Sequence, residues 1–148
     1  MKKTCAIIAS ACAALVFAAA AADGRATIRD EQGRKQGTRV VDSNGKTTYR
    51  DSLGRVTLTG TSDSSGKTVY RDSLGRKQGT KSTDSSGKTT YRDSLGRVKL
   101  TSNTDSSGKT TYRDAQGRII GTSQKDSSGR VTYRDAQGHR KGGLTPDK

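Results

Sequence analysis

The chain repeats itself with a period of 21 residues, and this period limits the possible folds more than any other feature. Five near-copies open at Asp42, Asp63, Asp84, Asp105 and Asp126. An earlier, diverged copy starts near residue 23, so that about six copies fill residues 23–141. A unit this short cannot bury an apolar face alone and needs to stack on its neighbours. We therefore expect residues 23–141 to form one array and residues 142–148 to form a flexible tail.

Each copy contains two Asp-x-x-Gly segments, which occupy residues 63–66 and 72–75 in the third copy. A type I turn favours Asp at its first position and Gly at its fourth, and Gly readily takes the left-handed conformation that ends a three-residue hairpin loop. The segments between the turns, such as 88–92 and 97–101, are rich in residues that favour strands. The sequence therefore predicts an all-β fold, an array of about six 21-residue β-hairpin repeats. It leaves open whether they form a closed ring or barrel, an open meander or a hairpin solenoid.

Side chains alternate between the two faces of a strand, and this assigns one large residue per copy to the interior. The expected inward row consists of Ile28, Tyr49, Tyr70, Tyr91, Tyr112 and Tyr133. On the second strand of a hairpin we expect an aliphatic pair such as Val56 and Leu58 to point inward as well. Alternate copies carry Gly in place of this Leu, which indicates either two packing environments or recent duplication. In a stack with free ends, Tyr91 is expected to stabilise the array more than Tyr133.

Composition excludes a conventional globular core. Between residues 23 and 148, Leu, Ile, Val and Phe number 15 of 126 residues, about 12%. A fraction below about 20% combined with a high net charge is typical of disordered chains. A helical bundle is excluded for the same reason, and any ordered structure depends on contacts between neighbouring copies.

Residues 1–22 have the pattern of a bacterial secretory signal peptide. Two lysines precede an apolar, alanine-rich run, and Ala20 and Ala22 match the small residues of a signal-peptidase site. We expect cleavage near Ala22, export to the periplasm or the exterior, and no transmembrane segment in the mature chain. The alternatives are an uncleaved membrane anchor and a lipoprotein acylated at Cys12. Both cysteines of the chain lie in this segment, so a mature chain has no disulfide or thiolate site.

The residue types predict no enzyme, no metal site and no cofactor. The single histidine, His139, cannot supply a histidine metal cluster and has no partner set for a catalytic triad. The aspartates stand at turn positions and are flanked by cations, whereas calcium sites favour clustered acidic residues.

The chain carries a formal net charge of +14 at pH 7, which favours polyanionic partners. Its basic residues fall into three rows at the repeat period. The first row is Lys46, Lys67, Lys88, Lys109 and Arg130; the second is Arg50, Arg71, Arg92, Arg113 and Arg134, preceded by Arg29; the third is Arg55, Arg76, Arg97 and Arg118, preceded by Arg34. We predict that these rows bind a polyanion, because guanidinium groups donate paired hydrogen bonds to anionic oxygens. A solvated face, partly paired with the aspartates, is the alternative.

These features favour an exported, non-enzymatic repeat protein of the cell envelope that binds an anionic polysaccharide, lipopolysaccharide or another anionic surface. We expect no nucleic-acid partner, because export removes the chain from the cytosol and the tyrosines face inward. A passive structural spacer and a cationic, largely disordered, membrane-active chain are the alternative functions. The sequence does not indicate an oligomeric state.

Three groups of repeat proteins share parts of this pattern. Residues 91–98, Tyr-Arg-Asp-Ser-Leu-Gly-Arg-Val, resemble the tyrosine–aspartate repeats of Rhs-type and teneurin-type β-shells. Gly87, Lys88, Tyr91 and Gly96 are similar to the choline-binding hairpin repeats of bacterial surface proteins, although the absence of Trp means that choline recognition is not implied. Residues 114–121 are similar to the hairpin units of secreted bacterial β-flower proteins. The resemblances imply a secreted bacterial β-hairpin repeat architecture.

Overall fold

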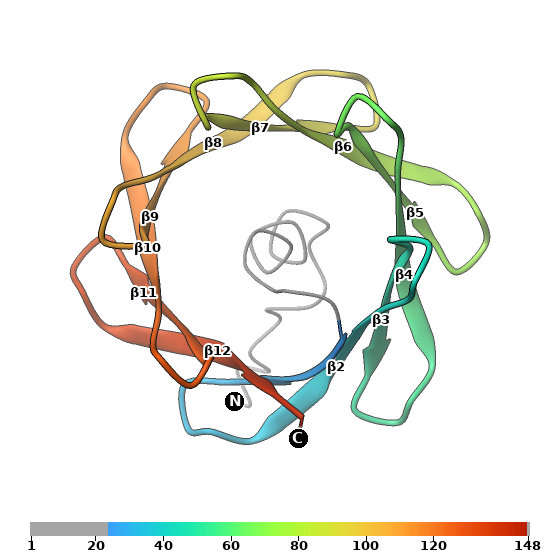
Figure 1. Ribbon diagram of the computed structural model, residues 1–148, viewed down its shortest axis with the longest axis horizontal. Coiled ribbons are helices and arrows are strands. Elements are labelled where there is room, and N and C mark those ends of the chain that lie inside the picture. Colours follow the sequence, from blue (N-terminus) through green and yellow to red (C-terminus); the bar gives the residue numbers. More distant parts are fainter. Residues whose placement is uncertain (1–23, 148) are drawn as a thin grey trace, which may run out of the picture.

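The computed structural model describes residues 24–147, which form a closed antiparallel β-barrel (Figure 1). Its twelve strands are β1 (Gly24–Arg29), β2 (Lys35–Val41), β3 (Thr47–Asp51), β4 (Val56–Ser62), β5 (Thr68–Asp72), β6 (Lys77–Thr83), β7 (Thr89–Asp93), β8 (Val98–Thr104), β9 (Lys109–Asp114), β10 (Ile119–Lys125), β11 (Val131–Asp135) and β12 (Arg140–Pro146). The prediction of an all-β array of hairpin repeats is confirmed. Among these residues there is no helix with the length and apolar character needed to span a membrane.

Each strand pairs with its neighbours in the sequence, and the last strand pairs with the first. In the closing pair, Ile28 of β1 lies opposite Leu144 of β12. Every strand of the described range therefore has two hydrogen-bonded neighbours. Of the three arrangements that the sequence left open, the structure is the closed barrel.

The prediction of a flexible tail over residues 142–148 is wrong, because residues 142–146 belong to β12. Leu144 is almost fully buried and lies between Val131 of β11 and Ile28 of β1. The partner that orders this segment, β1, lies at the other end of the sequence, so no pattern within one copy reveals it. The predicted signal peptide at residues 1–22 lies outside the described residues.

Eleven hairpin turns join the strands, and all have the same hydrogen bonds. In the turn that begins at Asp63, the Gly66 amide donates to the Asp63 carbonyl over 3.1 Å, and the Asp63 amide donates to the Lys67 carbonyl over 2.9 Å. One carboxylate oxygen of Asp63 accepts the amides of Ser65 and Lys67. Gly66 has φ 77°, a left-handed conformation that favours glycine. The turns predicted from Asp-x-x-Gly are confirmed.

The turns alternate between the two ends of the barrel, which we call the serine end and the leucine end after their exposed tips. The serine-end turns contain Gly45, Gly66, Gly87, Gly108 and Gly129, and the leucine-end turns contain Gly33, Gly54, Gly75, Gly96, Gly117 and Gly138. Each leucine-end hairpin carries a register shift: Tyr49 pairs with Leu58 but Arg50 pairs with Val56, which leaves Thr57 as an extra residue. Bulges of this kind increase strand twist and help a sheet to curve into a barrel.

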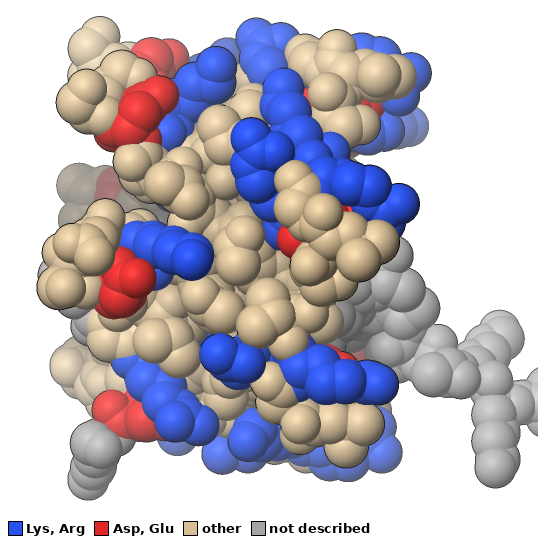
Figure 2. All heavy atoms as spheres, turned by 90° about the vertical axis from the view of Figure 1, so that its right-hand side faces the viewer, with Lys and Arg blue, Asp and Glu red and all other residues tan. Residues whose placement is uncertain are grey.

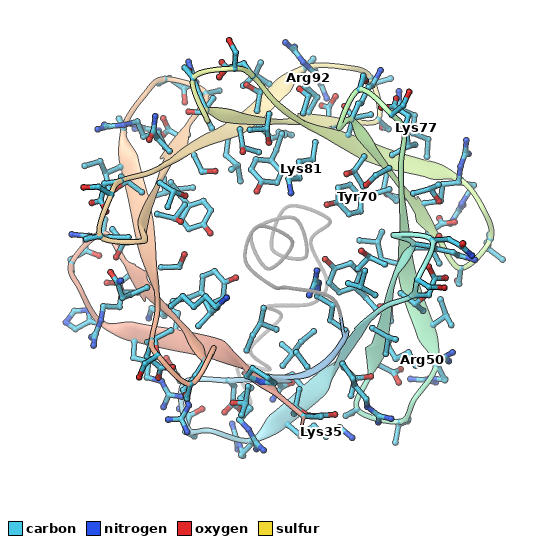
Figure 3. All side chains as sticks on the ribbon, in the orientation of Figure 1. Lys35, Arg50, Tyr70, Lys77, Lys81 and Arg92 are labelled. Atoms are coloured by element: carbon cyan, nitrogen blue, oxygen red, sulfur yellow. The ribbon has the colours of Figure 1, made fainter. Side chains whose placement is uncertain are left out.

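The predicted inward row is confirmed, since the five tyrosines and Ile28 are all buried. The rings of Tyr112 and Tyr133 lie 6.3 Å apart, within the range of favourable aromatic pairs. Figure 3 shows Tyr70 pointing into the ring of strands. Leu58 is buried, whereas Val56 is only half-buried. The core is thus a lining along the inner face of the barrel wall.

The alternation of Gly and Leu on the even-numbered strands reflects two packing environments. A Cβ atom at Gly37, Gly79 or Gly121 would overlap the carbonyl oxygen of Arg50, Arg92 or Arg134, respectively. Leu58 and Leu100, at the equivalent positions, instead fill the interior. Glycine is therefore required where two backbones approach closely.

Candidate functional site

The three predicted basic rows lie at distinct places on the barrel. We call them the lysine row (Lys46, Lys67, Lys88, Lys109 and Arg130), the strand arginine row (Arg29, Arg50, Arg71, Arg92, Arg113 and Arg134) and the turn arginine row (Arg34, Arg55, Arg76, Arg97 and Arg118). The lysine row follows the serine-end turns. The strand arginine row occupies the odd-numbered strands just before the leucine-end turns, and the turn arginine row follows those turns. Figure 3 shows Arg50 and Arg92 on the outer side of the wall.

The turn arginine row is paired with carboxylates. Arg55 Nε donates to Asp51 Oδ2 over 2.7 Å, and the other four arginines of this row make the same ion pair over 2.7 to 2.8 Å. The hydrogen bond from the Arg55 side chain is the main cause that lowers the pKa of Asp51. Much of the charge of this row is therefore compensated within each turn.

The strand arginine row is held by backbone carbonyls. In Arg92, Nη1 donates to the Gly96 carbonyl over 3.0 Å, and all six members make the equivalent bond over 2.9 to 3.1 Å. Within residues 24–147 no carboxylate forms an ion pair with this row. A carbonyl orients a guanidinium without cancelling its charge, so the row presents positive charge in a fixed position.

Three grooves on the outer wall occupy related positions in different repeats. The largest, of about 660 Å³, lies over β9, β10 and β11 and is lined by Lys109 and Arg134. A second, of about 290 Å³, lies over β7, β8 and β9 and is lined by Lys88 and Arg113. A third, of about 330 Å³, is lined by Lys67 and Arg71. Each groove thus combines one member of the lysine row with one member of the strand arginine row.

Small polar side chains cover the floor of the grooves. In the largest these are Thr122, Gln124 and Thr132, and the turn aspartates Asp126 and Asp135 also line this groove. The strand register repeats this arrangement, because Thr122 lies opposite Arg134 and Thr101 lies opposite Arg113. A floor of hydroxyl and amide groups between two cations offers hydrogen bonds to sugar hydroxyls and charge to anionic substituents.

Two further cations point into the barrel, and neither belongs to the three predicted basic rows. Arg39 is almost fully buried, and Figure 3 shows Lys81 directed inward. Burial and the positive charge of Arg39 lower the pKa of Lys81. The sequence pattern could have predicted their inward direction. Arg39 stands two positions after Gly37 and Lys81 two positions after Gly79, so each lies on the same inner face of its strand as that glycine.

The single histidine lies in a turn. His139 replaces the turn arginine in the last hairpin, and its Nδ1 lies 3.2 Å from Asp135 Oδ2. In residues 24–147 the structure brings together no group of three or more His, Cys, Asp or Glu residues that would hold a metal ion.

The carboxylates in the turns predict that the barrel loses stability at low pH. The Ser65 hydroxyl lowers the pKa of Asp63, and in Asp93 the raising effect of burial is outweighed by hydrogen bonds from Arg97. A lowered folded-state pKa stabilises the fold above the unfolded value of about 3.9 and is lost as the pH falls through the folded value. We expect the urea midpoint to stay nearly constant from about pH 7 to 5 and to fall steeply below about pH 4. A midpoint that declines already between pH 7 and 5 would contradict this account.

Fold and site together define the chain as a closed β-barrel of hairpin repeats with a basic outer wall. No model of a protein family matches the chain, and no curated protein matches it. Among solved structures that match is BamB from Moraxella catarrhalis, with 10% sequence identity and a TM-score of 0.35. The match covers 74% of this chain and spans 56% of that chain. A likeness at this level carries no conclusion about function.

Proposed function

We propose that the barrel is a non-enzymatic binding protein that holds an anionic polysaccharide or lipopolysaccharide in the grooves of its outer wall. The observation that supports the proposal is the repetition of one groove, with a lysine, a polar floor and an arginine held by a backbone carbonyl. A polymer with regularly spaced negative groups gains from several equivalent contacts at once. Export to a bacterial envelope and kinship with secreted hairpin-repeat proteins belong to the same proposal.

The proposal assigns binding to only part of the predicted rows. Three members of the lysine row and three of the strand arginine row line the grooves, whereas the turn arginine row is engaged by its own aspartates. The binding residues are therefore Lys67, Lys88 and Lys109 together with the arginines that share their grooves, Arg71, Arg113 and Arg134.

The two alternative functions agree less well with the barrel. Twelve paired strands over residues 24–147 do not fit a largely disordered, membrane-active chain. A fibre segment grows through free sheet edges, and the described strands have none. A passive spacer would also have no need of the repeated grooves.

Matched triple variants on a heparin column test the proposal. Changing Arg71, Arg92 and Arg113 to Gln removes three members of the strand arginine row, of which Arg71 and Arg113 line grooves. Changing Arg76, Arg97 and Arg118 to Gln removes the same charge from the paired turn arginine row. We expect the first variant to elute at clearly lower salt than the second. Retention of the unmodified barrel should fall with salt, since exposed charges are screened over about 8 to 10 Å. It should stay flat from about pH 5.5 to 8.5, because Arg and Lys titrate above about pH 10.

Equal losses in the two variants would leave net charge as the whole explanation and reject the groove. Thermal unfolding of both variants, followed by circular dichroism, checks that each remains a barrel. Sulfated, carboxylated and uncharged glycans on an array then identify the preferred substituent.

A further inference from the structure

The two ends of the barrel differ strongly in charge. The leucine-end segments are residues 29–36, 50–57, 71–78, 92–99, 113–120 and 134–141, and they contain sixteen Lys and Arg against seven Asp and Glu, a net charge of +9. The rest of the outer surface in residues 24–147, which is mainly the serine end, contains seven basic and six acidic residues, a net charge of +1. In the side view of Figure 2, Lys and Arg gather toward one end of the barrel.

The exposed large hydrophobic residues lie at the same end. Leu53, Leu74 and Leu95 form the tips of three consecutive leucine-end turns and are 76%, 74% and 76% exposed. Ile119 and Ile120, just after the next turn along the rim, are 47% and 43% exposed. The serine-end tips carry Ser or Asn instead. An exposed leucine has no role within its turn, because the equivalent positions hold Gln32, Gln116 and Gln137 in the other hairpins.

We propose that the leucine end docks on the surface of a membrane rich in anionic lipid. The three leucines enter the apolar region below the headgroups, and the surrounding arginines and lysines contact the negative headgroups. Leucines insert favourably into this boundary, and basic residues add attraction to anionic lipid.

The spacing of the leucines favours a lipid surface over a protein partner. Neighbouring tips are separated by two strands, which places them roughly 10 Å apart along the rim. Three separate points on a curved rim do not form the contiguous apolar patch that a protein interface buries at its centre. A fluid lipid surface accepts isolated side chains at any spacing, so it fits this arrangement.

Tryptophan fluorescence gives a direct test, because the chain contains no Trp. Leu74→Trp places a single reporter at the leucine end, and Ser85→Trp places one at the serine end. Both proteins are added to equimolar phosphatidylcholine–phosphatidylglycerol vesicles and to pure phosphatidylcholine vesicles. We expect a blue shift, and quenching by brominated acyl chains, only for Leu74→Trp with the anionic vesicles. An unshifted Leu74→Trp spectrum, or equal shifts at both ends, would overturn the proposal.

A second pair of variants measures the contribution of the leucines. Changing Leu53, Leu74 and Leu95 to Gln introduces the residue that the other turns already use, so the barrel is expected to remain folded. Changing Ser64, Ser85 and Ser106 to Gln is the control at the serine end. We expect the leucine variant to lose about tenfold or more in sedimentation with anionic vesicles, from the loss of buried apolar surface, and the control to match the original protein.

Heparin retention separates this proposal from that of the wall grooves. The leucine variant should keep its retention on heparin. Changing Lys67, Lys88 and Lys109 to Gln removes groove residues that lie outside the leucine-end segments, so this variant should lose heparin retention but keep the fluorescence shift of Leu74→Trp when the two are combined. Vesicle binding that is unchanged in the leucine variant would leave charge alone as its cause and reject docking by the leucines. An absence of vesicle binding in the original protein would reject the lipid surface and point to a protein partner.

Discussion

A chain that ends at Lys141 is expected to lose the cooperative unfolding transition of the barrel. The truncation removes most of β12, including Leu144, and leaves β1 and β11 without their shared partner. Loss of a buried leucine alone costs about 2 to 5 kcal/mol, and two hydrogen-bonded ladders are lost with it. We expect a total of at least about 5 kcal/mol, which is most of the stability of a typical domain.

Urea unfolding followed by far-ultraviolet circular dichroism measures this loss. Thr145→Ala, a change within the same strand at a less buried side chain, is the control and should have a small effect. The exposed edges of β1 and β11 should also drive association of the truncated chain, which sedimentation velocity detects. A truncated chain that unfolds at the original midpoint would show that residues 142–146 are a tail and that the barrel is open.

Replacing Tyr91 or Tyr133 with Ala should destabilise the barrel by about 3 to 5 kcal/mol in either case. The sequence predicts a smaller loss at Tyr133, because that residue lies near the end of the array. In the closed barrel both side chains are buried, and Tyr133 packs near Tyr112 on one side while its strand pairs with β12 on the other. Because the barrel is closed, the array has no free end, and we expect similar losses of stability at Tyr91 and Tyr133.

Tyr91→Phe and Tyr133→Phe separate the contribution of the ring from that of the hydroxyl. Each should lower the free energy of unfolding much less than the change to Ala at the same position. Urea midpoints of the four variants provide the comparison. A loss at Tyr133 less than half of that at Tyr91 would indicate a stack with free ends. No loss at either position would indicate that the row does not form a core.

The local structure could be predicted because each turn and strand is encoded within a few residues. Asp63 and Gly66 specify a turn by backbone conformation and by a carboxylate that accepts two nearby amides, and both effects are local. The inward position of Tyr91 follows from the alternation of side chains along a strand. Closure could not be predicted, because it depends on the pairing of Ile28 with Leu144, 116 residues apart, and on bulges whose combined curvature no single copy reveals.

The candidate site was predicted only in outline. The sequence places the three basic rows at regular positions, but it does not show that Arg55 folds back on Asp51 while Arg50 turns to the Gly54 carbonyl. That division depends on side-chain conformation at the turn. Two of the grooves combine cations of adjacent hairpins, such as Lys88 and Arg113, and therefore require the register between strands. Leu53, Leu74 and Leu95 recur at the repeat period, but their gathering at one end of the barrel follows from the alternation of the turns between the two ends.

The closing pair of strands also limits how such a protein changes its number of copies. Six hairpins complete the circle, so each turns the wall by about 60°. Gain or loss of one 21-residue unit changes the curvature at every junction between copies, including those far from the altered gene segment. Because the diameter of a barrel grows with its number of strands, a different copy number would require a different diameter and curvature throughout the wall. Copy number in a closed ring is therefore a property of the whole molecule.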